Sequence, residues 1–368
     1  MKPSISKLLF VVSLLLSIGL NGQDIHFSQF ETLSPILNPA FTGTPHLRQD
    51  GTNMRIAGIY RNQWSSLLRG ASYQTYGASL DASNCISKSV SWGWGLGIVH
   101  DESGTQSGTP DGRFNTFPFQ RDYVNLNGAM MVDLNSFFLS GGFRFRHTFS
   151  RLRTDELRYD EQFDGIGGFN PGIEGEFDNV DQLNSNNFDL GAGVAFLWLR
   201  EQQAFIGGAS MDYIYQPQDL QFIDSASPAR KTRRLTLHGK YTQVAWKPNK
   251  STIIGFILKG VYQLQSPYEQ WVLRGDLFLD QGDQWALILG GGYRQSRALE
   301  GYHADALLTT IGLNFPKFSL SINYDVNISS LSEVSNHYGA LEFSATYRWN
   351  RYAHKIVPKD KDICFQVP

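Results

Sequence analysis

Apolar and polar residues alternate strictly along several segments of this chain. Between positions 318 and 328 every second residue is apolar, in the order Phe318, Leu320, Ile322, Tyr324, Val326 and Ile328. The same alternation runs through 270–279 and 341–349. Successive side chains of a β-strand point to opposite faces, so each segment predicts a strand with one apolar and one polar wall. Two fold classes satisfy this pattern: a β-sandwich, and a transmembrane β-barrel with lipid outside and water inside.

The lengths of the connections separate these two classes. About fourteen strands are predicted, each close to the length that a tilted membrane strand needs, at 54–64, 72–82, 91–100, 121–133, 136–148, 187–200, 203–215, 232–246, 251–263, 268–280, 284–296, 303–314, 317–328 and 338–350. With a periplasmic N-terminus, the connections on that side are tight turns, and the opposite side carries the long polar loops 101–120, 149–186 and 216–231. This asymmetry is typical of outer-membrane barrels, so we predict an all-β, antiparallel transmembrane barrel.

Composition agrees with a barrel and excludes some partners. All eight tryptophans fall within or at the ends of predicted strands, where an indole favours the membrane interface. The chain has 32 basic and 34 acidic residues, so its net charge gives no indication of a nucleic-acid partner. One long apolar run, 8–20, lies near Lys2 and Lys7 and predicts a signal peptide over 1–22. We therefore expect an exported protein.

Four parts are expected: the signal peptide 1–22, an N-terminal segment 23–50, the barrel 51–350, and a tail 351–368 that leaves both termini periplasmic. The N-terminal segment has no strand pattern, yet it carries several apolar residues: Phe27, Phe30, Leu33, Ile36, Leu37 and Phe41. We predict that it folds into the lumen or caps it from the periplasmic side; the alternative is a disordered leader.

Two kinds of residue are predicted to face the lumen. Small residues, which often mark close approach of another backbone, are Gly93, Gly95, Gly97, Gly191, Gly193 and Ala195. Charged residues of both signs are Arg144, Arg146, Lys240, Arg274, Asp276, Glu342 and Arg348.

Three short sequence motifs occur near the start of the mature chain, at 23–30, 37–43 and 60–64. They read QDIHFSQF, LNPAFTG and YRNQW. In this order and spacing they resemble the start of PorP/SprF family proteins of the type IX secretion and gliding-motility apparatus. The resemblance implies an integral outer-membrane protein that acts without catalysis, docking the periplasmic machinery or anchoring a secreted surface adhesin. It implies partner-binding or plug roles for Phe27, Ser28, Gln29, Phe30, Asn38, Pro39, Ala40, Arg61, Asn62, Gln63 and Trp64.

Other functions of a barrel stay open at this stage. The motif Asn38-Pro39-Ala40 also resembles the hatch of FadL-type transporters, which pass hydrophobic small molecules. A transporter needs a hollow apolar lumen, a general porin needs a wet open one, and a docking protein is expected to have a filled one. Occupancy of the lumen therefore distinguishes the three.

Signals for chemistry are weak. His303 and Asp305 stand near a strand end, where hydrated rim residues are the simpler explanation, and we expect no catalytic site. Acidic residues in 160–181 lack the ordered spacing of a calcium loop, so no metal or cofactor is predicted. Cys85 and Cys364 are the two cysteines, both on the periplasmic side in this topology. They are a possible disulfide in an oxidising compartment; two unpaired thiols are the alternative.

Overall fold

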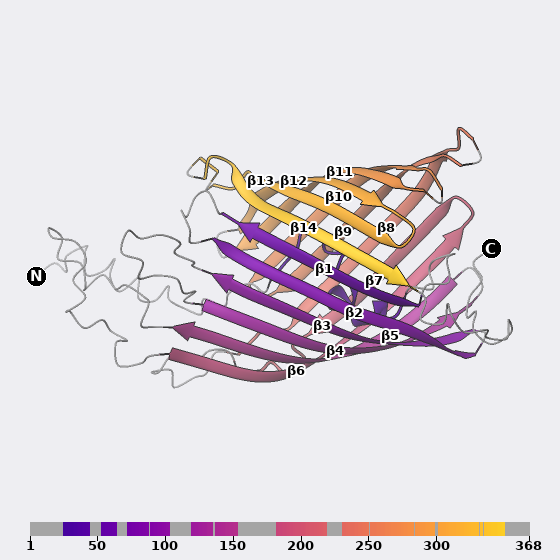
Figure 1. The fold of residues 1–368 in the computed structure, drawn as a ribbon. Helices are drawn as coiled ribbons and strands as arrows, with labels where there is room; N and C mark the ends of the chain where they lie inside the picture. Colours follow the sequence, from indigo (N-terminus) through magenta and orange to yellow (C-terminus); the bar gives the residue numbers. More distant parts are fainter. Residues whose placement is uncertain are drawn as a thin grey trace, which may run out of the picture.

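The computed structural model describes residues 25–44, 53–64, 72–87, 89–103, 119–134, 137–153, 182–218, 230–249, 251–282, 284–298, 301–330, 332–333 and 335–349. These residues form a closed antiparallel barrel in which each strand pairs with its neighbour along the chain and β1 closes on β14. Figure 1 shows the strands wrapped around one central axis. The predicted barrel of about fourteen strands is confirmed. No helix among the described residues is long and apolar enough to cross a membrane.

The strands lie close to their predicted positions. Their bounds are β1 (Met54–Gln63), β2 (Tyr73–Ser87), β3 (Val90–Ser103), β4 (Phe119–Asp133), β5 (Phe137–Arg153), β6 (Gln182–Arg200), β7 (Gln203–Asp212), β8 (Arg234–Trp246), β9 (Ile253–Gln265), β10 (Tyr268–Asp280), β11 (Ala286–Ala298), β12 (Gly301–Asn314), β13 (Phe318–Asn327) and β14 (Tyr338–Trp349). Several are longer than predicted, because β5 and β6 stay paired as far as Arg153 and Gln182.

The connections divide the barrel into two ends. At the short-turn end lie the links after β2, β4, β6, β8, β10 and β12, together with the start of β1 and the end of β14. At the long-loop end lie the links β3–β4, β5–β6 and β7–β8. This second end is not uniform, since β9 and β10 are joined there by the tight turn Ser266-Pro267.

The two walls of the barrel have opposite chemistry. On β10, the outward Trp271, Leu273 and Leu277 are 43%, 60% and 66% exposed, whereas the inward Arg274 and Asp276 are buried. On β13 the outward Leu320 and Ile322 are likewise exposed, while Asn323 and Asp325 are buried. An apolar outer wall around a polar interior is what a membrane barrel requires, because lipid contacts one face and the lumen the other.

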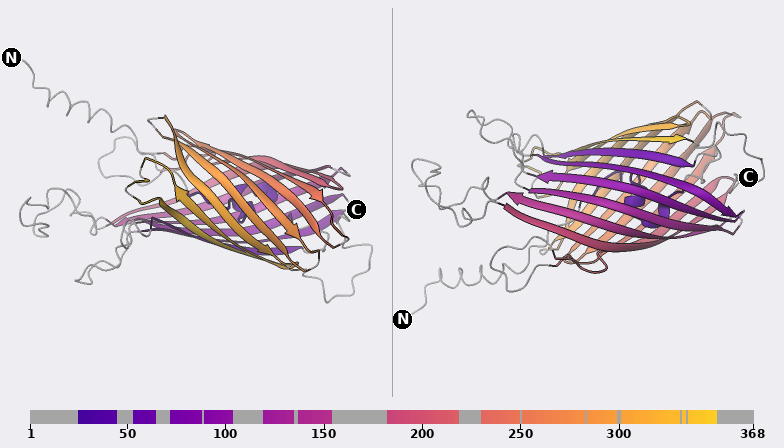
Figure 2. Two further views of the ribbon diagram at one scale, coloured as in Figure 1. Left: turned by 90° about the horizontal axis from the view of Figure 1, so that it is seen from above. Right: turned by 60° about the horizontal axis from the view of Figure 1, so that its bottom comes forward.

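A short segment fills part of the lumen. Residues 25–44, which we call the plug, carry the helix α2 (Ser34–Leu37) and the 3-10 turn η1 (Pro39–Phe41). Figure 2 shows this segment inside the barrel in both views. Ser28 contacts Asp325 and Glu342 near the long-loop end, and Gly43 contacts Asp81 near the short-turn end. The plug therefore runs along the lumen and does more than cap one mouth.

Candidate functional site: the plugged lumen

Local sequence explains the sharp bend in the plug. Pro35 stands in the first turn of α2, where its missing N–H removes no helical hydrogen bond. Asn38 ends α2 in an extended conformation, and its side-chain oxygen accepts a hydrogen bond from the backbone N–H of Ala40 at 2.9 Å. Pro39 then begins η1. The Asn-Pro-Ala motif therefore joins two short helical turns, and the Asn38 side chain caps the second one.

Asn38 also fixes the plug to the barrel wall. Its Nδ2 group donates to the carbonyls of Val194 (3.0 Å) and Ala209 (3.2 Å), which are paired across β6 and β7. The same nitrogen lies 2.9 Å from Nε2 of His238. Asn38 has no exposed surface, and its polar atoms are satisfied by the wall. Asn38 thus both caps a turn of the plug and holds the plug against β6 and β7.

Glycines in the wall leave room for the plug backbone. A Cβ added at Gly142 would lie 2.5 Å from backbone atoms of Pro39 and Ala40, and one at Gly93 would collide with the carbonyl of Thr42. One at Gly193 would collide with the side chain of Asn38. The prediction that Gly93 and Gly193 mark close approach of another segment is confirmed. Gly142 and Gly208 have the same role but were not predicted.

A first group of buried charges holds the start of the plug. Glu342 accepts the backbone N–H groups of Ser28 (2.7 Å) and Gln29 (2.9 Å), and its Oε1 pairs with Arg61 at 2.6 Å. Asp325 accepts the hydroxyl of Ser28 at 2.7 Å and pairs with Arg61 and Arg294. Both carboxylates are fully buried. Buried charges of this kind are tolerated because each is paired and hydrogen-bonded.

A second group holds the turn after Ser34. Arg144 donates to the carbonyls of Pro35 (2.5 Å) and Ile36 (2.7 Å) and pairs with Asp212 at 2.6 Å. Asp212 also pairs with Arg234 at 2.8 Å. The inward position of Arg144 was predicted, but its partner Asp212 on β7 was not, because alternation gives the face of a residue and not its neighbours on other strands.

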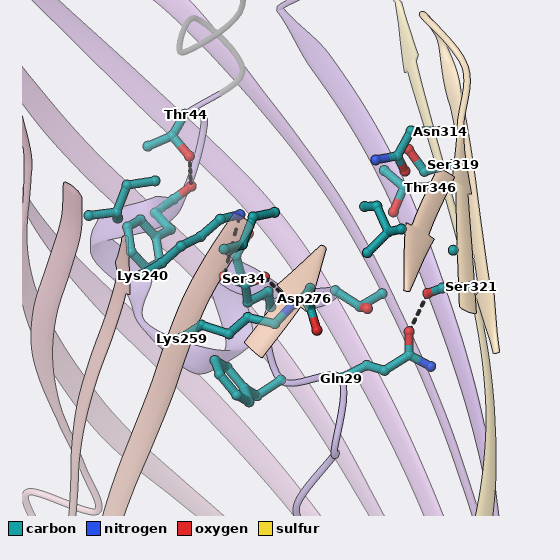
Figure 3. A pocket seen from close by; sticks show the side chains of 18 of the residues that line it. Gln29, Ser34, Thr44, Lys240, Lys259, Asp276, Asn314, Ser319, Ser321 and Thr346 are labelled. Atoms are coloured by element: carbon teal, nitrogen blue, oxygen red, sulfur yellow. Dashed lines mark hydrogen bonds and ion pairs between the residues drawn. The ribbon is translucent and has the colours of Figure 1, made fainter. Parts of the chain in front are cut away.

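A third group faces open space. Glu31 of the plug lies 3.2 Å from Nζ of Lys259 and 3.5 Å from Nζ of Lys240, and Lys259 also pairs with Asp276 at 2.7 Å. Although burial acts to raise the pKa of the Glu31 carboxyl, the two ammonium groups lower it to about 2. Glu31 is therefore ionised at neutral pH. Figure 3 shows Lys240, Lys259 and Asp276 beside the cavity that the plug leaves.

The cavities in the described part of the lumen include a large one with a mixed polar and apolar lining and a small apolar one. The large cavity, which we call the vestibule, measures about 1850 Å³ and is bounded by the plug and by short-turn-end residues such as Arg200, Gly282 and Pro316. The small cavity measures about 60 Å³ and is lined in part by Phe27, Phe30, Leu33 and Val261. The large cavity thus presents charged groups beside apolar surface.

The sequence-predicted site residues fall into two groups. Ser28, Gln29, Phe30, Asn38 and Ala40 are buried in the lumen, as is Arg61 on β1. Phe27 packs beside Leu33, and Pro39 is buried in η1. Gln63 accepts from Arg61 at 3.2 Å and so joins the edge of the first charged group.

Asn62 and Trp64, the two remaining predicted site residues of the third motif, lie away from the charged groups. Asn62 donates to the hydroxyl of Tyr60, and Trp64 packs edge-on against Tyr73 with ring centroids 5.4 Å apart. These contacts do not bring Asn62 and Trp64 into the group formed by Ser28 and Arg61.

The other candidate residues lie partly inside and partly outside the described ranges. Asp305 pairs with Arg294 at 2.5 Å, a contact that ties it to the first charged group. No group of three or more His, Cys, Asp or Glu residues in the described ranges is arranged to hold a metal ion. The acidic loop 160–181 and Cys364 lie outside those ranges. Cys85 belongs to β2 and not to a connection, because β2 continues to Ser87; its disulfide remains a prediction.

Comparison with solved structures supports the fold. The chain is similar to a deltaS2 mutant of the monoaromatic hydrocarbon channel TodX, with TM-score 0.52 and 13% identity over 87% of this chain and 94% of that one. It is also similar to the P. putida toluene transporter TodX, with TM-score 0.50 and 13% identity over 86% and 93% of the two chains. At these identities the similarity concerns the outer-membrane barrel fold alone.

Sequence comparison gives the family. No curated protein matches this chain. The family model for the type IX secretion system membrane protein PorP/SprF, however, matches residues 19–347, which is most of the chain and includes the plug and nearly the whole barrel. The match agrees with the three sequence motifs and with the transmembrane barrel. This chain therefore belongs to the PorP/SprF family of type IX secretion outer-membrane proteins.

Proposed function

We propose that this protein acts in type IX secretion by binding and not by catalysis, either joining the periplasmic machinery to the outer membrane or anchoring a secreted surface adhesin. The observation that carries the proposal is the plug, which is fixed inside the lumen. The plug is held by hydrogen bonds to Glu342, Asp325 and Arg144, which are buried and ion-paired within the barrel wall. A segment fixed in this way suits a permanent component of the barrel, because releasing it would remove hydrogen-bond partners from several buried charged side chains.

In this proposal the short-turn end faces the periplasm and the long-loop end faces outward. The support is the general topology of outer-membrane barrels, which have short periplasmic turns and longer external loops. The tail that follows Trp349 would then begin in the periplasm, beside the open mouth of the vestibule. A periplasmic N-terminus is part of the same prediction, and the residues before Ile25 lie outside the described ranges.

Deleting residues 24–45 tests the proposal, with the signal peptide retained. We expect the shortened barrel to insert and to keep heat-modifiable migration in gels, but to lose type IX secretion or adhesin display. The full gene deletion serves as the reference for complete loss, and a type IX-independent outer-membrane protein serves as the control for envelope integrity. Normal secretion by both deletion strains would contradict the proposed role.

A FadL-like transporter of hydrophobic molecules is the second candidate. The barrel fold shared with the TodX hydrocarbon channel favours it. The charged residues Lys240, Lys259 and Asp276 on the wall of the vestibule weigh against it. The more apolar cavity measures about 60 Å³, far below the several hundred Å³ of typical small-molecule pockets. Uptake of labelled toluene or fatty acid by the gene deletion strain separates the two candidates: a transporter predicts reduced uptake with normal secretion, and a docking protein predicts the reverse.

A further inference from the structure

Strand β6 extends well past the end of its neighbour β7 at the long-loop end. The ladder between β6 and β5 starts at the pair Arg153–Gln182, whereas the ladder between β6 and β7 starts only at the pair Ala192–Met211. Among the described residues, no strand therefore pairs with 182–191 on the side away from β5, which we call the β6 edge. Figure 1 shows this end of β6 at the lower left, beside β5. At about 3.3 Å per residue the β6 edge is roughly 30 Å long.

The backbone groups on the β6 edge belong to alternate residues. In an antiparallel ladder the N–H and C=O of one residue point to the same neighbouring strand, and those of the next residue point to the other side. The carbonyl of Leu190 accepts the N–H of Ile214 at 3.2 Å on the side away from β5. Counting back in steps of two, the N–H and C=O groups of Phe188, Asn186 and Asn184 point to the same side.

The chain that follows β7 does not cover the β6 edge beyond Leu190. The N–H of Tyr215 donates to the side-chain carboxylate of Asp189 at 3.1 Å. The side-chain amide of Asn187 donates to the carbonyl of Gln218. Both contacts are made on the inner face of β6, so the described link residues 213–218 leave the backbone of the edge unpaired. An unpaired strand edge is a template for pairing with another chain.

The outer face of the same stretch changes from apolar to polar. Phe188 is 56% exposed and stacks on His147 with ring centroids 4.2 Å apart. Asn186 and Asn184, the next outward residues, are exposed and polar. Because aromatic girdles of outer-membrane barrels lie at the membrane–water interface, the part of the β6 edge from Asn186 to Gln182 lies on the aqueous side. A protein outside the membrane can therefore reach it.

We propose that the β6 edge binds an extended segment of the secreted surface adhesin, which adds a strand to the barrel sheet. In this mode of recognition, main-chain hydrogen bonds to an exposed edge supply affinity and alternate side chains supply specificity. The segment that fits has an apolar side chain beside Phe188 and polar side chains beside Asn186 and Asn184. This inference deepens the adhesin-anchoring form of the proposed function and rests on its assignment of the long-loop end to the cell surface.

Binding of a synthetic peptide to the purified full-length protein provides the first test, read by fluorescence anisotropy. The probe is a labelled peptide in which Thr and Val alternate between terminal lysines. Its control is the same sequence with every backbone nitrogen methylated, which keeps the side chains and removes the N–H donors. We expect the control to bind at least about tenfold more weakly, because main-chain hydrogen bonds hold the added strand.

Variants of the β6 edge test the same contact from the side of the protein. Asn184→Pro/Asn186→Pro removes two N–H groups of the edge and keeps the pairing with β5, since proline is tolerated where the N–H faces away from a paired strand. We expect this variant to bind the unmodified peptide about tenfold more weakly, through loss of two hydrogen bonds. The matched control Asn184→Ala/Asn186→Ala keeps both N–H groups and should bind within about twofold of wild type.

Other results would overturn the inference. Equal affinity of the two peptides, or of the proline and alanine variants, would show that the peptide binds elsewhere. We expect rapid hydrogen–deuterium exchange at the Asn184 and Asn186 amides of the free protein, and slower exchange once the peptide is added. Slow exchange in the free monomer would show that its own chain covers the β6 edge. A dimer that the proline variant dissociates would assign the edge to a second copy.

A test in cells separates this inference from the proposed function. The proline variant is expected to insert normally and to reduce adhesin display to near the level of the gene deletion, while the alanine variant displays the adhesin normally. Normal display by the proline variant, with display lost in the gene deletion, would refute the β6 edge as the docking site and leave the proposed function intact. Normal secretion and display in the gene deletion itself would refute the proposed function.

Discussion

At the scale of single residues, two neighbouring glycines of β5 differ in their contact with the plug. A Cβ at Gly142 would lie 2.5 Å from the plug backbone, whereas a Cβ at Gly141 meets no atom within 4 Å. We expect Gly142→Ala to destabilise the docked plug by about 1–3 kcal/mol through overpacking, and Gly141→Ala to change stability by less than about 0.5 kcal/mol. Thermolysin digestion and thermal unfolding of both variants measure the difference. Equal behaviour of the two would contradict the docking surface described here.

The carboxylate of Glu342 provides a second residue-scale prediction. Replacing it with Gln removes the charge that pairs with Arg61 and one of the acceptors for the plug N–H groups. Because this would leave Arg61 with Asp325 as its one remaining carboxylate in a buried site, we expect a loss of about 3–5 kcal/mol. Glu201→Gln, in an exposed turn, is the control. Stability equal to wild type would argue against the first charged group as the anchor of the plug.

Sequence patterns predicted which residues face the lumen but not which residues meet there. Alternation placed Arg144, Arg274 and Glu342 on the inner wall, and all three are buried there. The partners Asp212, Asp325 and Arg294 were not predicted, because pairing across a lumen depends on strand register and on the path of the plug. Neither the strand register nor the path of the plug is determined by a local sequence pattern.

At the scale of elements, strand positions followed well from periodicity. The bounds of β10 match the predicted 268–280, and most other strands differ by a few residues. The larger differences occur where β2, β5 and β6 extend beyond the predicted span, into segments whose composition resembles loops. Hydrogen bonding to a neighbouring strand overrides weak local preference there.

The orientation of the barrel gives an element-scale prediction. Tyr215, in the β7–β8 link, is 67% exposed at the long-loop end, and Lys247 is exposed at the short-turn end. With the native cysteines replaced by serine, Tyr215→Cys should react with an impermeant maleimide on intact cells. Lys247→Cys should react after the outer membrane is opened. The reverse pattern would mean that the barrel is inverted and that the vestibule opens outward.

At the scale of the whole molecule, the same barrel fold serves different functions. TodX is a hydrocarbon channel, and this chain shares its fold at 13% identity. In this chain the lumen contains a fixed plug. Here Ser28 of the plug is hydrogen-bonded to Asp325, Glu342 and Arg294, and the carbonyl of Pro35 accepts from Arg144. Glu31 adds ion pairs to Lys240 and Lys259 beside the vestibule. Fold similarity therefore leaves the choice between docking and transport to the contents of the barrel.

Electrical conductance across a planar lipid bilayer tests the central claim, that the plug closes the path through the lumen, most directly. The full-length protein should insert without a steady open current, because the plug interrupts the path between the two ends. The variant lacking residues 24–45 should conduct as an open pore, since it loses Ser28, Asn38 and the other groups that occupy the lumen. A full-length protein that conducts steadily, to the same extent as the deletion variant, would contradict a filled lumen and with it the docking role proposed from it.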